Sequence, residues 1–152
     1  MAGSLPLEVA LKSPADKFWA AIRDSTELFP KIFPDQYKSI KVVEGDGKSV
    51  GSIRVIDYAE GMPVSYSKEK IKVADDATKK VTYAVVDGDI LSFYKVFEAT
   101  LQVVLSADAK SSVAKWDIHY EKANPDVPEP NLIQDLASKT FKALDDHVMG
   151  AA

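Results

Sequence analysis

The sequence predicts an α+β fold in which a seven-stranded antiparallel sheet wraps around one long C-terminal helix. Two patterns support this prediction. Between residues 37 and 122, six consecutive segments have the composition of strands and are joined by short turn-forming connections, which favours an antiparallel meander. Near the C-terminus, an apolar stripe at helical spacing runs from Ile133 to Val148. Because a sheet of this size cannot cover its own apolar face, we expect the helix to pack against it.

The N-terminal region predicts the first strand and two short helices. From Leu5 to Leu11 every second residue is apolar, which is the period of a strand with one buried face. The run Ser13–Asp16 then offers a capping serine, a first-turn proline and an acidic residue, which together predict the start of a helix. A second short helix is expected from about Thr26 to Phe33, with Pro30 making it irregular. Both helices therefore fall between the first and second strands.

The other strands are placed by β-rich runs that lie between turn residues. Turns are predicted at Glu44–Gly47, Glu60–Pro63 and Asp87–Asp89, because these residue types tolerate tight or positive-φ conformations. Three prolines between Asn124 and Pro130 forbid a helix interior or a central strand, so this segment is predicted to be a connector. With no internal repeat, residues 1–152 are expected to form a single domain. The six expected strands cover residues 37–43, 52–58, 64–73, 80–86, 93–105 and 113–122.

Composition excludes several classes of protein. The 152 residues include no cysteine, so neither a disulfide framework nor a thiolate metal site can form. The net charge of −4 comes from acids and bases that alternate along the chain, which argues against nucleic acid as a partner. No run of 18 apolar residues occurs, and residues 1–12 do not resemble a secretory signal. We therefore predict no membrane span and expect a cytoplasmic location.

Several ordered motifs resemble one plant family, the major latex protein-like branch of the birch pollen allergen superfamily, also called pathogenesis-related class 10. The resemblance runs nearly end to end and implies a helix-grip fold with a large internal cavity. It also implies a protein that binds, carries or stores small hydrophobic or amphipathic plant metabolites in defence or stress responses, and we expect this protein to be a monomer. A few relatives in the superfamily instead catalyse cyclisation or condensation. The motifs are Ser13–Trp19, Leu28–Lys31, Pro34–Ile40, Glu44–Arg54, Asp87–Asp89, Tyr94–Phe97 and Lys115–Asp117.

The walls of this expected cavity follow from strand alternation. Phe97, Ala99 and Leu101 share one face of their strand, and Trp116 and Ile118 share one face of the next. Without the resemblance, such residues would most simply fill a solid core. Inward tyrosines and an arginine favour an amphipathic interior, because a buried polar tip without a partner costs about 1–3 kcal/mol. By phase and by similarity to the family, the predicted ligand-binding residues are Arg54, Ile56, Tyr58, Val64, Tyr66, Val81, Tyr83, Phe97, Ala99, Leu101, Trp116, Ile118, Ile133, Leu136, Ala137, Thr140 and Phe141.

In this set Arg54 and the tyrosine hydroxyls are expected to orient a hydroxyl or carboxylate of the ligand. An enzyme would need an inward lysine or carboxylate beside a tyrosine. Lys68 and Lys70 share the predicted phase of Tyr66, but they are more simply solvated near the cavity mouth, so no catalytic residue is predicted.

Other specialised sites are disfavoured. The loop Gly45–Gly51 has the wrong spacing for a nucleotide-binding loop and precedes a strand. A hormone-receptor function is also disfavoured. Receptor relatives carry the gate motifs Ser-Gly-Leu-Pro-Ala and His-Arg-Leu, whereas this chain has Glu60–Val64 at the position of the first motif and nothing that resembles the second. His119 and His147 are expected on the surface, so neither a metal nor a cofactor is predicted. The acids Asp87, Asp89, Asp145 and Asp146 are assigned to turns and to a solvated helix face.

Overall fold

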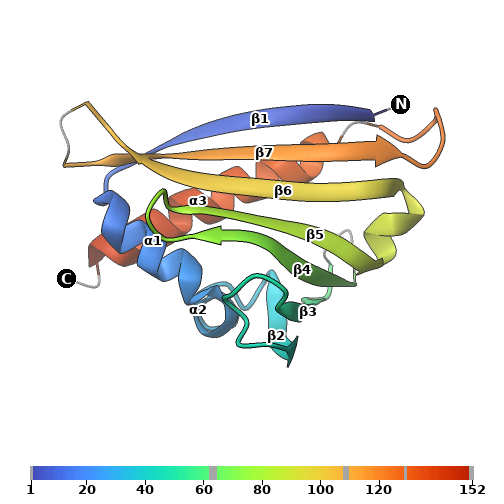
Figure 1. Ribbon diagram of the computed structural model, residues 1–152, viewed down its shortest axis with the longest axis horizontal. Coiled ribbons are helices and arrows are strands. Elements are labelled where there is room, and N and C mark those ends of the chain that lie inside the picture. Colours follow the sequence, from blue (N-terminus) through green and yellow to red (C-terminus); the bar gives the residue numbers. More distant parts are fainter. Residues whose placement is uncertain (1, 62–64, 108–109, 129, 151–152) are drawn as a thin grey trace.

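In the residues that it describes, the computed structural model contains one seven-stranded antiparallel sheet and three α-helices, which confirms the predicted fold class (Figure 1). The structure describes residues 2–61, 65–107, 110–128 and 130–150. The strands are β1 (Ala2–Leu11), β2 (Tyr37–Glu44), β3 (Ile53–Tyr58), β4 (Tyr66–Asp75), β5 (Lys80–Gly88), β6 (Tyr94–Leu105) and β7 (Ser112–Lys122). The α-helices are α1 (Ala15–Arg23), α2 (Ser25–Ile32) and α3 (Asn131–Gly150), and a short 3₁₀ helix, η1 (Asp89–Ser92), joins β5 to β6.

The sheet order is β1-β7-β6-β5-β4-β3-β2, so the first strand pairs with the last. In that pairing Leu7 lies opposite Trp116, and Trp116 in turn lies opposite Leu101 of β6. These cross-strand partners place the apolar residues of β1, β6 and β7 on one face of the sheet, as the alternation predicts. The same face receives α3.

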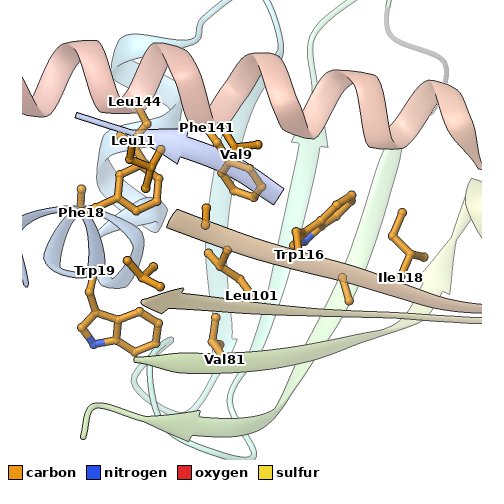
Figure 2. Close-up of a cluster of buried hydrophobic side chains, with 14 of the residues drawn as sticks. Val9, Leu11, Phe18, Trp19, Val81, Leu101, Trp116, Ile118, Phe141 and Leu144 are labelled. Carbon is orange, nitrogen blue, oxygen red and sulfur yellow. The ribbon is translucent and has the colours of Figure 1, made fainter. Parts of the chain in front are cut away.

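Helix α3 crosses this face of the sheet, and α1 and α2 lie near its C-terminal end (Figure 1). The space between α1, α3 and the sheet is filled by side chains here (Figure 2). The ring of Phe18 packs edge-on to Phe141 at a centroid separation of 6.3 Å, and Trp116 meets Phe141 at 6.0 Å. Phe18 and Leu144 are fully buried. Burial of each such side chain contributes roughly 1.5–3 kcal/mol of stability. We call this closely packed end of the interior, around Phe18, Phe141 and Leu144, the dry core.

The start of α1 corrects two expectations. Ser13 does not cap the helix, because Pro14 occupies the N-cap position and no side chain caps it. The Ser13 hydroxyl instead donates to Oδ1 of Asp145 at 2.5 Å, and the backbone N–H groups of Lys12 and Ser13 donate to the same carboxylate at 2.8 and 2.9 Å. Asp145 is only 4% exposed, so its assignment to a solvated helix face is wrong. Its partners lie more than 130 residues away in the chain, where local sequence patterns give no signal.

Candidate ligand-binding site

Away from the dry core, the sheet and α3 do not close on each other. They enclose a cavity of about 410 Å³, which also borders α2, η1 and the connector before α3. Most of the wall is aliphatic or aromatic, with a few polar side chains reaching inward. Sites for small molecules are commonly apolar hollows of roughly 300–1,000 Å³ with a small number of placed polar groups. The cavity has both properties.

Most of the residues that the sequence predicts for this site do line the cavity. Ala99 and Ile118 are exceptions, because both are buried in packed parts of the interior and do not border the open space. Val64 lies outside the described residues. The predicted residues that do line the cavity are Arg54, Ile56, Tyr58, Val81, Tyr83, Phe97, Leu101, Trp116, Ile133, Leu136, Ala137, Thr140 and Phe141. Their contact with a ligand stays a prediction.

The prediction that Tyr66 faces the cavity is wrong. In β4 the buried positions are Ser67, Glu69 and Ile71, so Tyr66 lies on the outer face and is 36% exposed. Cross-strand pairing explains this, because Ser67 lies opposite the inward Ile56 of β3. The outward phase also carries Lys68 and Lys70, which removes both lysines from the cavity. On this outer face, the nearby Asp87 carboxylate raises the pKa of the Tyr66 phenol.

Glu69 is the polar cavity residue that sequence reasoning missed. It lies directly opposite Arg54 in the β3–β4 pairing, and the Arg54 Nη2 group donates to Glu69 Oε1 at 3.1 Å. The two side chains are only 11% and 8% exposed. The sequence did contain a signal for this pair, because opposite charges favour facing positions on paired strands. Using that signal requires the register of β3 with β4, which depends on the length of the turn between them.

The ion pair is held from a second element as well. Arg54 Nη1 donates to the hydroxyl of Ser25 at 3.0 Å, which ties β3 to the first turn of α2. The guanidinium carbon lies 5.9 Å from the centre of the Tyr83 ring on β5. The Nε group of Arg54 is buried and has no hydrogen-bond partner among the described residues. One donor of this fixed, charged side chain is therefore left unused within the cavity wall.

Three tyrosines surround this pair, and burial sets their ionisation. The phenol oxygen of Tyr58 and the hydroxyl oxygen of Ser67 are 3.2 Å apart. Burial raises the pKa of Tyr83 to about 12 and raises the pKa of Tyr37 and Tyr58, with a further contribution from the nearby Glu69 carboxylate. Burial also raises the pKa of Glu69, although Arg54 opposes this shift. The tyrosines are thus neutral hydrogen-bonding groups at physiological pH.

The cavity reaches solvent where η1 meets β6. Phe93 borders the cavity yet is 49% exposed, whereas its neighbours Ile90 and Val127 are buried. The hydroxyl of Tyr94 donates to the carbonyl of Pro128 at 2.7 Å, which fixes the proline-rich connector against the sheet. Phe93 therefore stands at an edge of the hollow rather than in its wall.

In the glycine-rich loop between β2 and β3, the carboxylate of Asp46 accepts hydrogen bonds from the loop itself. Asp46 accepts the backbone N–H groups of Lys48 and Ser49 at 2.8 and 2.7 Å, and the Ser49 hydroxyl at 2.8 Å. These hydrogen bonds hold the pKa of Asp46 well below its usual range. The amides are therefore occupied by a fixed internal anion.

The histidines and acids outside the cavity are the remaining groups in the chain that could bind a metal ion. His119 and His147 are both exposed, as expected. Within the described ranges, no group of three or more acidic or histidine side chains is arranged to hold a metal ion. No helix in the described part of the chain is long and apolar enough to cross a membrane.

A curved sheet that holds a long helix around a cavity defines a known class, and the chain belongs to the pathogenesis-related protein Bet v 1 family, whose family model matches residues 1–151. MLP-like protein 423 of Arabidopsis thaliana is 41% identical over 150 residues, which cover 98% of this chain and 96% of the relative. The resemblance to major latex proteins is therefore confirmed.

Solved structures agree. Major latex-like protein 151 from Panax ginseng superposes with a TM-score of 0.86 at 28% identity, over 97% of each chain. Norcoclaurine synthase from Thalictrum flavum, solved with dopamine and hydroxybenzaldehyde, gives a TM-score of 0.82 over 100% of this chain and 89% of the enzyme. Because the two sequences are only 21% identical, this superposition shows a shared fold and nothing further.

Proposed function

We propose that this protein reversibly binds small hydrophobic or amphipathic molecules in the cavity between the sheet and α3. The observation that supports this function is a partly open cavity of about 410 Å³ with a mainly apolar wall. A guest that loses about 300 Å² of apolar surface to the wall gains roughly 7 kcal/mol, before the entropic cost of association is subtracted. Affinity is therefore expected to be modest, and selectivity to depend on the few polar groups.

Family membership supports a proposal about the biological setting. We propose that the whole chain, residues 1–152, acts as one monomeric binding unit that carries or stores plant metabolites in the cytoplasm during defence or stress. The support is membership of the pathogenesis-related family and the similarity to major latex proteins of plants. Steroids, fatty acids, phenolics and hormones are the classes to examine first.

Displacement of a fluorescent apolar probe tests the binding function. N-phenyl-1-naphthylamine is expected to bind the protein saturably and to be displaced by members of a metabolite panel. Ala137→Trp on the cavity face of α3 should fill the space and abolish probe binding. The matched variant Ala143→Trp, on the exposed side of the same helix, should bind as the parent does. Absence of probe binding by the parent protein would contradict the proposal.

A second candidate function is acid–base catalysis in the same cavity, such as cyclisation, condensation or isomerisation of a terpenoid or alkaloid precursor. It is favoured by Glu69, an inward carboxylate whose pKa is raised by burial and which lies among tyrosines. Incubation with candidate precursors should then give products that depend on Glu69 and Tyr58. Product profiles that are unchanged in Glu69→Gln and Tyr58→Phe would dismiss catalysis by these groups.

A further inference from the structure

The charge of the cavity is balanced before any guest enters. The charged residues among the described lining residues are Arg23, Arg54 and Glu69. Arg23 lies at the rim, where its Nε is 3.4 Å from Asp76 and its Nη1 donates to the Lys48 carbonyl. Deeper inside, Arg54 and Glu69 pair at 3.1 Å. Each inward cation therefore already has its own anion.

The ion pair with Arg54 favours the ionised form of Glu69 despite its buried position. An arginine stays protonated in proteins, so a protonated Glu69 would leave Arg54 as a buried cation without a counter-charge. Desolvation raises the pKa of Glu69, but the guanidinium beside it opposes neutralisation. The pair is consequently a neutral unit, and a guest meets no net positive charge at Arg54.

Among the described residues, two side chains that line the cavity each carry a hydrogen-bond donor that has no acceptor. The Nε group of Arg54 and the Nε1 group of Trp116 are both buried and unpartnered. The Tyr83 phenol lies near the Trp116 indole, but the two groups do not meet hydrogen-bond geometry. Buried donors without partners cost free energy. Neither nitrogen is itself exposed to the open space, so an acceptor atom of a guest reaches it, and recovers this free energy, through a small shift of the Arg54 or Trp116 side chain.

Together these features define a guest. We infer that the cavity selects uncharged amphipathic molecules with an acceptor oxygen, such as a ketone, amide or alcohol, over the corresponding carboxylates. This inference rests on the proposed binding function and narrows its ligand class. A neutral oxygen satisfies Arg54 Nε or Trp116 Nε1 without disturbing the ion pair. A carboxylate would place a second buried anion beside Glu69, which is unfavourable unless one of the two is protonated.

This preference for neutral oxygens differs from the prediction made from the sequence alone, which allowed either a hydroxyl or a carboxylate of the ligand at Arg54. That expectation treated Arg54 as a free cation. The cross-strand position of Glu69 removes the free charge and leaves only the hydrogen-bonding role.

Three naphthalenes of nearly equal shape test the inference by displacement of N-phenyl-1-naphthylamine at slightly alkaline pH. 2-Acetylnaphthalene carries a neutral acceptor, 2-naphthoate carries a carboxylate, and 2-isopropylnaphthalene carries neither. The ketone is expected to bind about fivefold more tightly than the hydrocarbon and about tenfold more tightly than the carboxylate. Equal or tighter binding of naphthoate by the parent protein overturns the inference, whatever any variant does.

Variants then assign the selectivity to the ion pair. In Glu69→Gln the cavity gains a net positive charge, so naphthoate should overtake the ketone. Glu98→Gln is the matched control, because Glu98 pairs with Lys72 at 3.0 Å on the outer face of the sheet and its loss should leave the order unchanged. The double variant Arg54→Met, Glu69→Gln removes both charges and keeps a neutral wall, which protects against misfolding of the single variant. It should lose most of the preference for the ketone over the hydrocarbon.

The outcomes separate this inference from the function on which it rests. If neither the fluorescent probe nor any naphthalene binds, the binding function itself is wrong. If the probe binds and the order is carboxylate before ketone, the cavity binds guests but the selectivity inferred here is wrong. A Glu69→Gln protein that folds, as judged by circular dichroism, and retains the parent order also overturns the role assigned to Glu69.

Discussion

Two buried carboxylates, Asp145 and Glu69, mark two differently built ends of the same interior. Asp145 lies at the dry end and accepts three hydrogen bonds from residues 12 and 13, so it joins α3 to the turn between β1 and α1. Glu69 borders the open end and pairs with Arg54, whose Nε is left without a partner. The first carboxylate is saturated by protein groups, and the second leaves hydrogen-bonding capacity beside an open space. The difference separates a polar group that supports the fold from one that is available to a guest.

The largest expected effect tests the dry end. Asp145→Ala leaves two backbone N–H groups and the Ser13 hydroxyl buried without an acceptor, so the free energy of unfolding should fall by about 3–5 kcal/mol. Urea denaturation measures this loss. Asp146→Ala is the neighbouring control, because Asp146 is 73% exposed and only 4.0 Å from Lys12 Nζ, and it should change stability little. Equal losses in the two variants would remove the contrast.

A pair of identical truncations on α3 compares the two ends directly. Leu144 is fully buried in the dry core, so Leu144→Ala should lower the free energy of unfolding by about 3 kcal/mol. Leu136 borders the existing cavity, so Leu136→Ala should cost about 1 kcal/mol but change the affinity for N-phenyl-1-naphthylamine. Thermal unfolding and probe titration give both quantities. The opposite order of stabilities would show that the space near Leu136 is closed in solution.

Alkaline pH tests the burial of the tyrosines at the open end. The folded-state pKa of Tyr83 is about 12 against an ordinary value of 10.0. The stabilising contribution of the neutral phenol is therefore fully present below pH 10 and is lost as the pH rises towards 12, by up to about 1.4 kcal/mol per pH unit. Urea midpoints measured across this range should fall less steeply in Tyr83→Phe. A slope identical to that of the parent protein would place Tyr83 in contact with bulk water.

The smallest expected effect concerns the outer face of β4. Tyr66→Phe and Lys68→Ala should leave probe affinity and stability nearly unchanged, because both side chains point away from the cavity. The probe titration used for Leu136→Ala supplies the comparison. A large loss of binding in either variant would restore the inward phase expected from sequence and contradict the register of β3 with β4.

Sequence reasoning succeeded where alternation was unambiguous. In β6 and β7, the apolar phase that includes Phe97, Leu101 and Trp116 contrasts clearly with charged or polar neighbours, and the structure places that phase inward. The stripe of α3 was equally clear. Both patterns reflect burial against a large apolar surface, which is the property that periodicity reports.

It failed where polar residues occupy both phases or where partners are remote. In β4, Tyr66 and Lys68 alternate with Ser67 and Glu69, so hydrophobicity does not choose the inward set. Only pairing with β3, which places Glu69 opposite Arg54, decides the phase. Asp145 presents the second kind of failure, because its hydrogen bonds join the two ends of the chain. The size of the cavity follows from how far α3 stands from the sheet, and no local pattern encodes that distance.

Helix α3 is fastened near both ends and borders open space in between. The Tyr94–Pro128 hydrogen bond fixes the connector just before it, and the contacts of Asp145 fix its last turns. Between these anchors, Ile133, Leu136 and Ala137 border the cavity, so substitutions there are expected to change binding more than stability. The ligand selectivity of this scaffold can therefore be redesigned from the middle of one helix, while residues outside the cavity maintain the fold.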